Sequence, residues 1–111
     1  YTHMHSDHVN GIDELRVIRF RSKKLVPIYA DHATMIDLKA RFPYLFEGGQ
    51  SELYPPIIEP HILDEQHFGT RRHFGDIAYV PFAQDHGTCM SVGYRFGDLG
   101  YSVDIFDLDD K

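Results

Sequence analysis

The opening residues of the chain restrict its fold and chemistry more than any other segment. The run Tyr-Thr-His-Met-His-Ser-Asp-His places three histidines and an aspartate within six positions, at His3, His5, Asp7 and His8. If the backbone is extended through His3, His5 and Asp7, the two-residue period of a strand points these side chains to one side. His8 joins them only if the chain turns, and a turn is expected because a helix follows. The motif is therefore predicted to lie at a strand-to-helix junction that offers four metal ligands.

Chance is a poor explanation for this pattern, even in a chain with 8 histidines among 111 residues. With the chain's own composition, the pattern would arise at random with a probability on the order of 0.004. The alternative explanation is a polar, histidine-rich loop without a ligand. Imidazole and carboxylate groups are ligands that zinc and manganese take in proteins. The motif therefore predicts a metal site.

Two later segments carry side chains of the same kind. Gln-Asp-His-Gly at 84–87 follows an apolar run at 77–82, so a strand that ends here would present His86 at its end. Tyr-Ser-Val-Asp at 101–104 is read in the same way, as a strand that ends in the carboxylate of Asp104. Each segment alone is weak, because a lone histidine or aspartate at a strand end is usually a polar residue at the sheet margin. Together with the opening motif, they predict ligands at one edge of a sheet.

The first half of the chain is predicted to contain two helices and a strand. Ile12, Leu15 and Ile18 recur at helical spacing, which predicts a helix over 11–21 with these residues on its buried face. A strand is expected at 25–30. Asp31 is a candidate N-cap for a second helix over 32–41, which Pro43 should end.

The second half is predicted to be rich in strands. The segment 46–56, with Gly-Gly and Pro-Pro pairs, is expected to be a loop that forms a lid or rim. Strands are expected at 57–63, 66–73, 76–84, 90–96 and 100–103. The turns Phe-Gly-Asp at 74–76 and Gly-Asp-Leu-Gly at 97–100 indicate antiparallel hairpins.

Composition excludes several classes of function. The net charge of −6 argues against extended nucleic acid as a partner, although a short anionic substrate remains compatible. No apolar run approaches the roughly 18 residues needed to span a bilayer, so no membrane partner is expected. The single cysteine, Cys89, cannot form an internal disulfide and is most simply a small buried residue. We therefore expect a cytoplasmic protein.

The length of 111 residues allows one domain at most. The chain begins at Tyr1, inside the motif, and ends at Lys111 just after an acidic stretch. We therefore expect it to be a segment of a longer protein.

The order of the three motifs resembles that of the metallo-β-lactamase superfamily. Thr-His-x-His-x-Asp-His, a distant His86 and then Asp104 follow one another as in that superfamily. Ser-Val-Gly-Tyr-Arg-Phe-Gly at 91–97 and Gly-Tyr-Ser-Val-Asp at 100–104 look like later strands of its phosphoribosyl cyclic phosphodiesterase branch, with ribonuclease Z more distant. The resemblance implies an α+β fold, the αββα four-layer sandwich. Residues 1–111 would be a partial single domain that lacks N-terminal strands and a C-terminal part.

The resemblance also implies a ligand set for two divalent ions, zinc or manganese. It assigns His3, His5 and His86 to one ion, Asp7 and His8 to the other, and Asp104 to both as the bridging carboxylate. The superfamily has one more histidine ligand after this aspartate, and no histidine follows His86 in this chain.

The activity that the resemblance implies is metal-dependent hydrolysis. The expected substrate, and the expected partner, is a small cyclic phosphate or nucleotide-like phosphodiester, attacked by a hydroxide that bridges the two ions. Asp7 is the catalytic candidate beyond the metals, since its second carboxylate oxygen can orient that hydroxide or take its proton. Two alternatives stay open: a lactone or thioester hydrolase of the same fold, and a metal-binding or nucleotide-binding protein without turnover. A homodimer is also left open, and no substrate-binding residue is assigned.

Two weaker groups have ordinary explanations beside a functional one. The basic residues of 16–24 would attract a phosphate, but a charged helix face is usually only solvated. His61, His67 and His73 would line a substrate pocket, yet exposed positions on half-buried strands explain them equally well.

Overall fold

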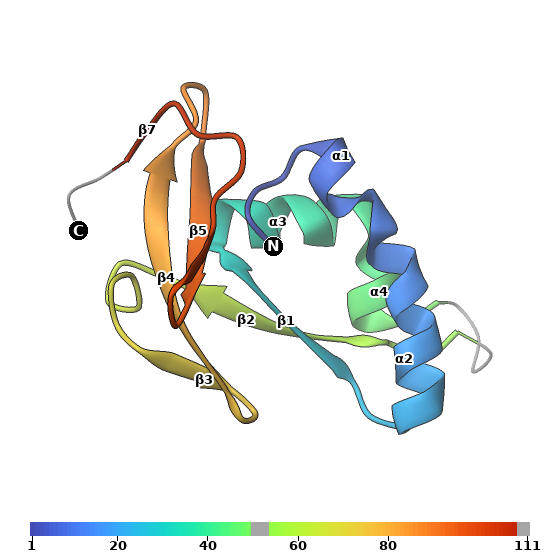
Figure 1. The fold of residues 1–111 in the computed structure, drawn as a ribbon. Coiled ribbons are helices and arrows are strands. Elements are labelled where there is room, and N and C mark those ends of the chain that lie inside the picture. The colour runs from blue at the N-terminus through green and yellow to red at the C-terminus, as the bar shows by residue number, and fades with distance from the viewer. Residues whose placement is uncertain (50–53, 109–111) are drawn as a thin grey trace. The chain divides into compact units, whose positions relative to one another are not determined.

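The computed structural model describes residues 1–49 and 54–108 (Figure 1). The chain forms two compact units, each with its own elements. The N-terminal unit consists of Tyr1 and His3–Ile62, and the C-terminal unit of Thr2 and Leu63 onward. Among the described residues, none of the helices is both long enough and apolar enough to cross a membrane.

The N-terminal unit carries most of the helices. In chain order its elements are α1 (Ser6–Val9), a 3₁₀ helix η1 (Asn10–Glu14), α2 (Leu15–Ser22), β1 (Val26–Asp31), α3 (His32–Arg41), α4 (Pro43–Glu47) and β2 (Ile58–Leu63). β1 and β2 form a two-stranded sheet. Its apolar core is built from Val9, Ile12, Ile28, Ala30, Met35, Leu38, Leu45, Ile57 and Ile58.

The predicted helix over 11–21 is only partly confirmed. Residues 10–14 form a 3₁₀ helix, and the α-helix begins at Leu15. Ile12 is buried, but Ile18 is 51% exposed, and α2 buries none of its residues. A 3₁₀ helix has about three residues per turn instead of 3.6, so it shifts the face on which later residues lie. The prediction that Ile18 shares a buried face with Ile12 is therefore wrong.

The predicted strand at 25–30 and the helix over 32–41 are confirmed as β1 and α3. The backbone N–H of Thr34 donates to the carboxylate of Asp31 at 3.0 Å, so Asp31 is the N-cap. Phe42 adopts φ −129° and ψ 52°, outside the helical region, as expected for a residue that precedes proline. Pro43 does more than end α3: it occupies the first turn of α4, where a missing N–H costs nothing.

The predicted loop over 46–56 is wrong at its start. Phe46 and Glu47 belong to α4, and Gly48 is its C-cap residue with a positive φ of 84°. Residues 50–53 of this prediction lie outside the described residues.

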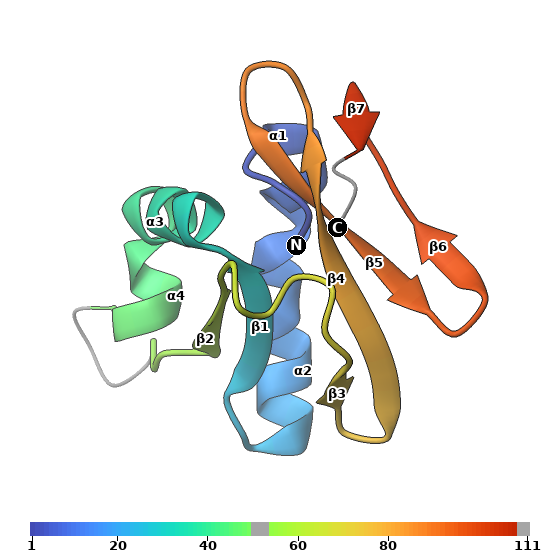
Figure 2. The ribbon, with the colours of Figure 1, turned by 90° about the vertical axis from the view of Figure 1, so that its left-hand side faces the viewer.

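The C-terminal unit is an antiparallel sheet. Its strands are β3 (Arg72–Phe74), β4 (Ile77–Asp85), β5 (Met90–Phe96), β6 (Leu99–Tyr101) and β7 (Asp107–Leu108), in the order β3-β4-β5-β6 with β7 paired to β4. Figure 2 shows the long β4–β5 hairpin, with β6 beside β5. The predicted hairpin turns are confirmed, and Gly75 and Gly97 supply the left-handed conformation at φ 55° and 60°.

Two strand predictions need correction. Of the predicted strand 66–73, only 72 and 73 pair in the sheet, as part of β3. The earlier residues form a turn, because the backbone N–H of Asp64 donates to Nδ1 of His67 at 3.0 Å and that of His67 returns to the Asp64 carbonyl at 2.9 Å. The predicted strand 100–103 is observed at 99–101, and Ser102 and Val103 leave the sheet.

The centre of the β4–β5 hairpin is tightly packed. A Cβ atom added at Gly93 would overlap the ring of Phe82 and would lie 2.8 Å from Oε1 of Gln84. Gln84 and its cross-strand partner Ser91 are both buried. The hairpin thus has a polar pair within it, directly before the segment that holds His86.

Candidate metal-binding residues

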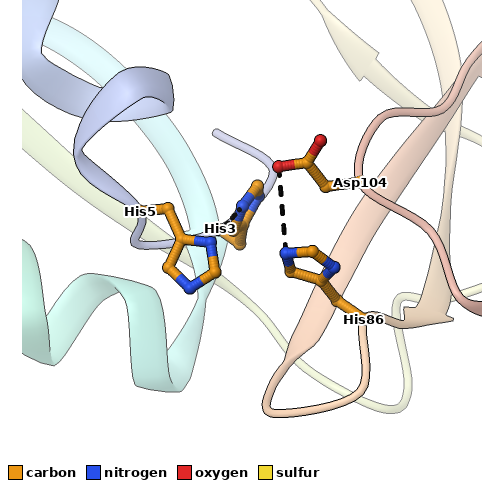
Figure 3. A group of neighbouring side chains, drawn as sticks. All are labelled: His3, His5, His86 and Asp104. Atoms are coloured by element: carbon orange, nitrogen blue, oxygen red, sulfur yellow. Dashed lines mark hydrogen bonds and ion pairs between the residues drawn. The ribbon is translucent and has the colours of Figure 1, made fainter.

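The three imidazoles of the opening motif lie against one another in the N-terminal unit. Nε2 of His3 is 3.1 Å from Nδ1 of His5, as the dashed line in Figure 3 marks. The ring centre of His3 lies 4.6 Å from that of His5 and 4.4 Å from that of His8. His3 is fully buried, whereas His5 is exposed and His8 half-buried. The predicted convergence of these imidazoles is therefore present.

The backbone that produces this convergence differs from the prediction. The structure assigns no strand to residues 1–5, although His5 is extended with φ −63° and ψ 143°. α1 begins at Ser6, and the backbone N–H of His8 donates to the carbonyl of His5 at 2.9 Å. Asp7 lies within α1, so the condition of an extended backbone from His3 through Asp7 is not met. Strand-like alternation relates His3 to His5 only, and a helical turn brings His8 back to His3.

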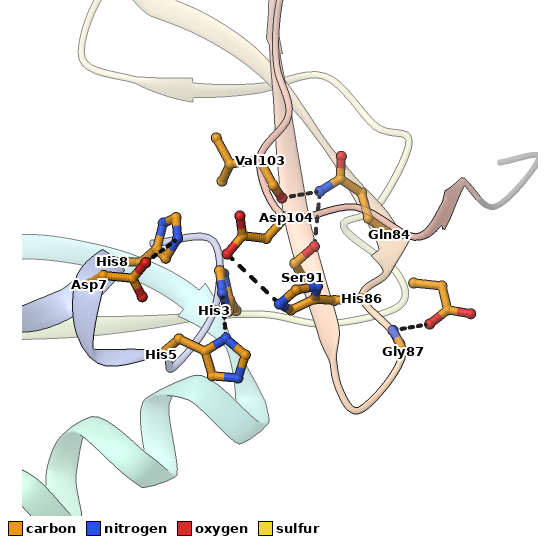
Figure 4. Close-up of polar contacts among 11 residues, drawn as sticks. His3, His5, Asp7, His8, Gln84, His86, Gly87, Ser91, Val103 and Asp104 are labelled. Atoms are coloured by element: carbon orange, nitrogen blue, oxygen red, sulfur yellow. Dashed lines mark hydrogen bonds and ion pairs between the residues drawn. The ribbon is translucent and has the colours of Figure 1, made fainter.

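Asp7 lies in the first turn of α1 with its side chain directed outward. The carboxylate is 80% exposed, and its Oδ2 atom is 3.4 Å from Nε2 of His8 (Figure 4). An acidic group in the first turn of a helix is stabilised by the backbone N–H groups there. Asp7 is therefore open to solvent and in electrostatic contact with a candidate ligand.

His86 directly follows β4, as predicted, in the loop of the β4–β5 hairpin. Its backbone N–H donates to the carbonyl of Cys89 at 2.9 Å. The carboxylate of Asp85 accepts the N–H of Gly87 at 2.7 Å, and Gly87 has a φ of 88° that favours glycine. These contacts close a short turn that begins at His86. Within the same unit, Nε2 of His86 lies 3.8 Å from Oδ2 of Asp104.

Asp104 does not end a strand, which corrects the prediction. β6 ends at Tyr101, and Asp104 lies in the following bend with a φ of 51°. The side chain of Gln84 in β4 holds this segment through hydrogen bonds (Figure 4). Its amide nitrogen donates to the hydroxyl of Ser91 at 2.9 Å and to the carbonyl of Val103 at 3.4 Å, and its carbonyl oxygen accepts the hydroxyl of Ser102. The position of Asp104 therefore depends on a buried amide.

The donor atoms within each unit fit a divalent cation. Two imidazole nitrogens bound to one tetrahedral zinc lie roughly 3.3 Å apart, given Zn–N bonds of about 2.0–2.1 Å. The 3.1 Å between Nε2 of His3 and Nδ1 of His5 is close to that spacing. Imidazole paired with carboxylate, as in His86 and Asp104, is also a donor set that zinc and manganese accept.

Comparison with known proteins agrees with these observations. The family model described as "Beta-lactamase superfamily domain" matches residues 1–110. The chain belongs to this superfamily. The α+β class is thereby confirmed, and the chain is part of the metallo-β-lactamase fold.

Two known proteins are similar to this chain over most of its length. A solved structure described as a new diphosphatase from the PhnP family matches with a TM-score of 0.70 and 30% identity, over 90% of this chain and 35% of that one. An octanoyltransferase of Porphyromonas gingivalis (strain ATCC BAA-308 / W83) is 25% identical over 107 residues, which are 96% of this chain and 20% of that protein. The chain thus spans about a third and a fifth of the length of these two relatives. The first match agrees with the branch predicted from the sequence.

Two residues that support the candidate ligands, Gln84 and Arg41, were not identified from the sequence. Gln84 stands two positions before His86, but nothing local shows that its side chain holds Ser102 and Val103. Arg41 ends α3, and its guanidinium reaches Met4 and Ser6, on either side of His5. No local sequence pattern predicts a contact between residues that are 35 or 37 positions apart in the chain.

Among the weaker candidates, His61 and His67 have structural partners. His61 is 2.6 Å from the carboxylate of Glu59 and stacks on Tyr29, and His67 is 3.1 Å from the carboxylate of Asp64. Arg21, Lys23 and Lys24 are exposed, as expected of a solvated face, while Arg16 and Arg19 are half-buried. His73 is exposed at a sheet margin, and Cys89 is half-buried instead of buried.

Proposed function

We propose that the protein is a metal-dependent hydrolase of phosphate esters, a phosphodiesterase that acts on a small cyclic phosphate or nucleotide-like ester. The observation that carries the proposal is the match to a PhnP-family diphosphatase, whose name states chemistry at a phosphorus–oxygen bond. The pair His3 and His5 independently supports metal dependence, because the 3.1 Å between their ring nitrogens suits a divalent cation.

In this proposal the metal ligands are those implied by the family resemblance. His3, His5 and His86 would hold one zinc or manganese ion, Asp7 and His8 the second, and Asp104 both. When bound, divalent ions supply positive charge for the phosphate oxygens and increase the acidity of water.

The chain's own contribution to the chemistry centres on Asp7. Asp7 is the one acidic residue of the opening motif and its side chain is 80% exposed, so its carboxylate can receive a proton from water as the water oxygen attacks phosphorus. The new phosphorus–oxygen bond forms as the bond to the leaving oxygen breaks, and the leaving oxygen takes a proton from solvent. Oδ2 of Asp7 lies 3.4 Å from Nε2 of His8, so the two side chains are close enough to bind the same ion.

A second candidate is hydrolysis at a carbonyl carbon, with a lactone or thioester as substrate. The octanoyltransferase relative favours it, because its name states acyl chemistry. We give it second place because the identity is lower and the match covers a fifth of that protein.

The test is a substrate comparison on the intact protein loaded with zinc or manganese. A generic aryl phosphodiester and a ribose cyclic phosphate are assayed beside a lactone and a thioester, with the His5→Ala variant as the control for metal dependence. Cleavage of the phosphodiesters, lost in the variant, supports the proposal. Cleavage of the lactone or thioester alone would support the second candidate. Stoichiometric metal with no turnover would indicate a binding protein.

A further inference from the structure

The guanidinium of Arg41 contacts the opening motif on both sides of His5. Nη2 donates to the backbone carbonyl of Met4 at 2.6 Å, and Nη1 donates to the hydroxyl of Ser6 at 3.3 Å. The third nitrogen, Nε, is 2.8 Å from Oδ2 of Asp37, one helical turn earlier in α3. All three nitrogens of the group are thus engaged by different partners within the N-terminal unit.

The backbone around His5 has little regular structure of its own. Residues 1–5 are not assigned to a strand, and the N-cap residue of α1, His5, provides no side-chain hydrogen bond to the first turn. Met4 and Ser6 are the immediate neighbours of His5 in the chain. A group that holds the carbonyl before His5 and the hydroxyl after it restricts the backbone rotation that aims the imidazole.

Arginine suits this role better than lysine. Its planar group presents donors in a fixed fork, so it can hold two acceptors and a carboxylate at once. The guanidinium of Arg41 also lies over the ring of Phe42, with 5.5 Å from its central carbon to the ring centre. Asp37 and Phe42 therefore restrict the Arg41 side chain independently of its contacts with the motif.

We infer that Arg41, anchored by Asp37, is a positioning residue for the metal ligands His3 and His5. The inference rests on the proposed function, because it assumes that these imidazoles bind metal. Groups that orient metal ligands typically change metal affinity by 10- to 100-fold when they are removed. A loss of about that size is expected for Arg41→Ala.

The experiment measures metal affinity in the intact protein, without any substrate. Zinc affinity is determined by competition with a chromophoric chelator, and the visible spectrum of the cobalt-loaded protein reports ligand geometry. The variants are Arg41→Ala, Arg41→Lys and Asp37→Asn. Lys39→Ala is the matched control, since it removes a cation from the same last turn of α3, and Lys39 contacts Phe46 instead of the motif. Thermal unfolding of the metal-free proteins separates ligand positioning from general stability.

The expected result is a 10- to 100-fold weaker zinc affinity and an altered cobalt spectrum in Arg41→Ala, with a smaller loss in Asp37→Asn. Arg41→Lys should restore affinity only in part. Lys39→Ala should match the wild type, and metal-free Arg41→Ala should unfold within a few degrees of it. Wild-type affinity and spectrum in Arg41→Ala would overturn the inference and leave the proposed function standing. A wild-type protein that binds no divalent ion would overturn both, whereas the expected affinities without phosphodiester turnover would overturn the proposed function alone.

Discussion

His3 and His5 share a hydrogen bond of 3.1 Å between Nε2 and Nδ1, yet one imidazole is fully buried and the other is exposed. Replacing His5 therefore removes a candidate metal ligand from the surface. Replacing His3 removes a candidate ligand and also leaves a cavity in the interior. We predict that His5→Ala weakens zinc affinity and, when metal-free, loses less folding free energy than His3→Ala, because removal of the exposed ring lets water reach Nε2 of His3. His3→Ala should weaken affinity and also lose roughly 1–3 kcal/mol of folding free energy. Chelator competition and urea unfolding of both variants measure this difference, and equal destabilisation would contradict it.

Replacing Gln84 should both destabilise the fold and disturb Asp104. Its amide satisfies the buried Ser91 hydroxyl and holds Ser102 and Val103. Gln84→Ala leaves buried polar groups without their partner, which costs about 1–3 kcal/mol. Urea unfolding measures this cost, and zinc affinity should fall as well. The matched control is Gln66→Ala, because Gln66 is exposed in a turn and should change stability by less than about 0.5 kcal/mol.

Gly93→Ala should be strongly destabilising. The added methyl group would collide with the ring of Phe82. Such an insertion into a packed core typically lowers the folding free energy by about 1–3 kcal/mol. Gly100→Ala is the control on β6 of the same sheet, since nothing lies within 4 Å of a Cβ atom there. Thermal unfolding of the two variants should therefore differ by several degrees, and similar midpoints would show that Phe82 relaxes without cost.

Asp31→Ala should cost about 1 kcal/mol, because it removes the side chain that caps α3 through Thr34. Asp31→Asn keeps the capping oxygen and should recover most of this loss. Denaturant unfolding distinguishes the two. Equal losses in both variants would indicate that the charge of Asp31, and not its capping hydrogen bond, is what stabilises the helix.

Asp7→Asn should reduce phosphodiester turnover more than metal affinity. The amide keeps an oxygen donor but cannot accept a proton, and general-base groups contribute typically 10²- to 10⁴-fold to the rate. The measurement is kcat on an aryl phosphodiester at saturating zinc, beside the zinc affinity of both proteins. Turnover equal to that of the wild type would assign the proton transfer to another group, and equal losses in both quantities would assign Asp7 to metal binding alone.

Much of the fold followed from short-range patterns. The cap at Asp31, the end of α3 before Pro43 and the glycine turns of the hairpins each depend on a few neighbouring residues. Their conformations are limited by local sterics and hydrogen bonds, so a sequence can show them directly. α4 was missed because the same proline that ends one helix is well suited to begin another.

For the candidate site too, local sequence predicts one part and long-range contacts decide the other. The sequence by itself determined which donors are available, in the spacing of His3, His5 and His8 and in the placement of His86 after a strand. Only the tertiary structure decided how they are held: Arg41 reaches Met4 over 37 positions, and Gln84 reaches Val103 over 19. Such contacts depend on where the chain returns in space, and no local pattern records that. For the same reason, the helical turn that aims His8 and the left-handed bend at Asp104 appeared only in the folded chain.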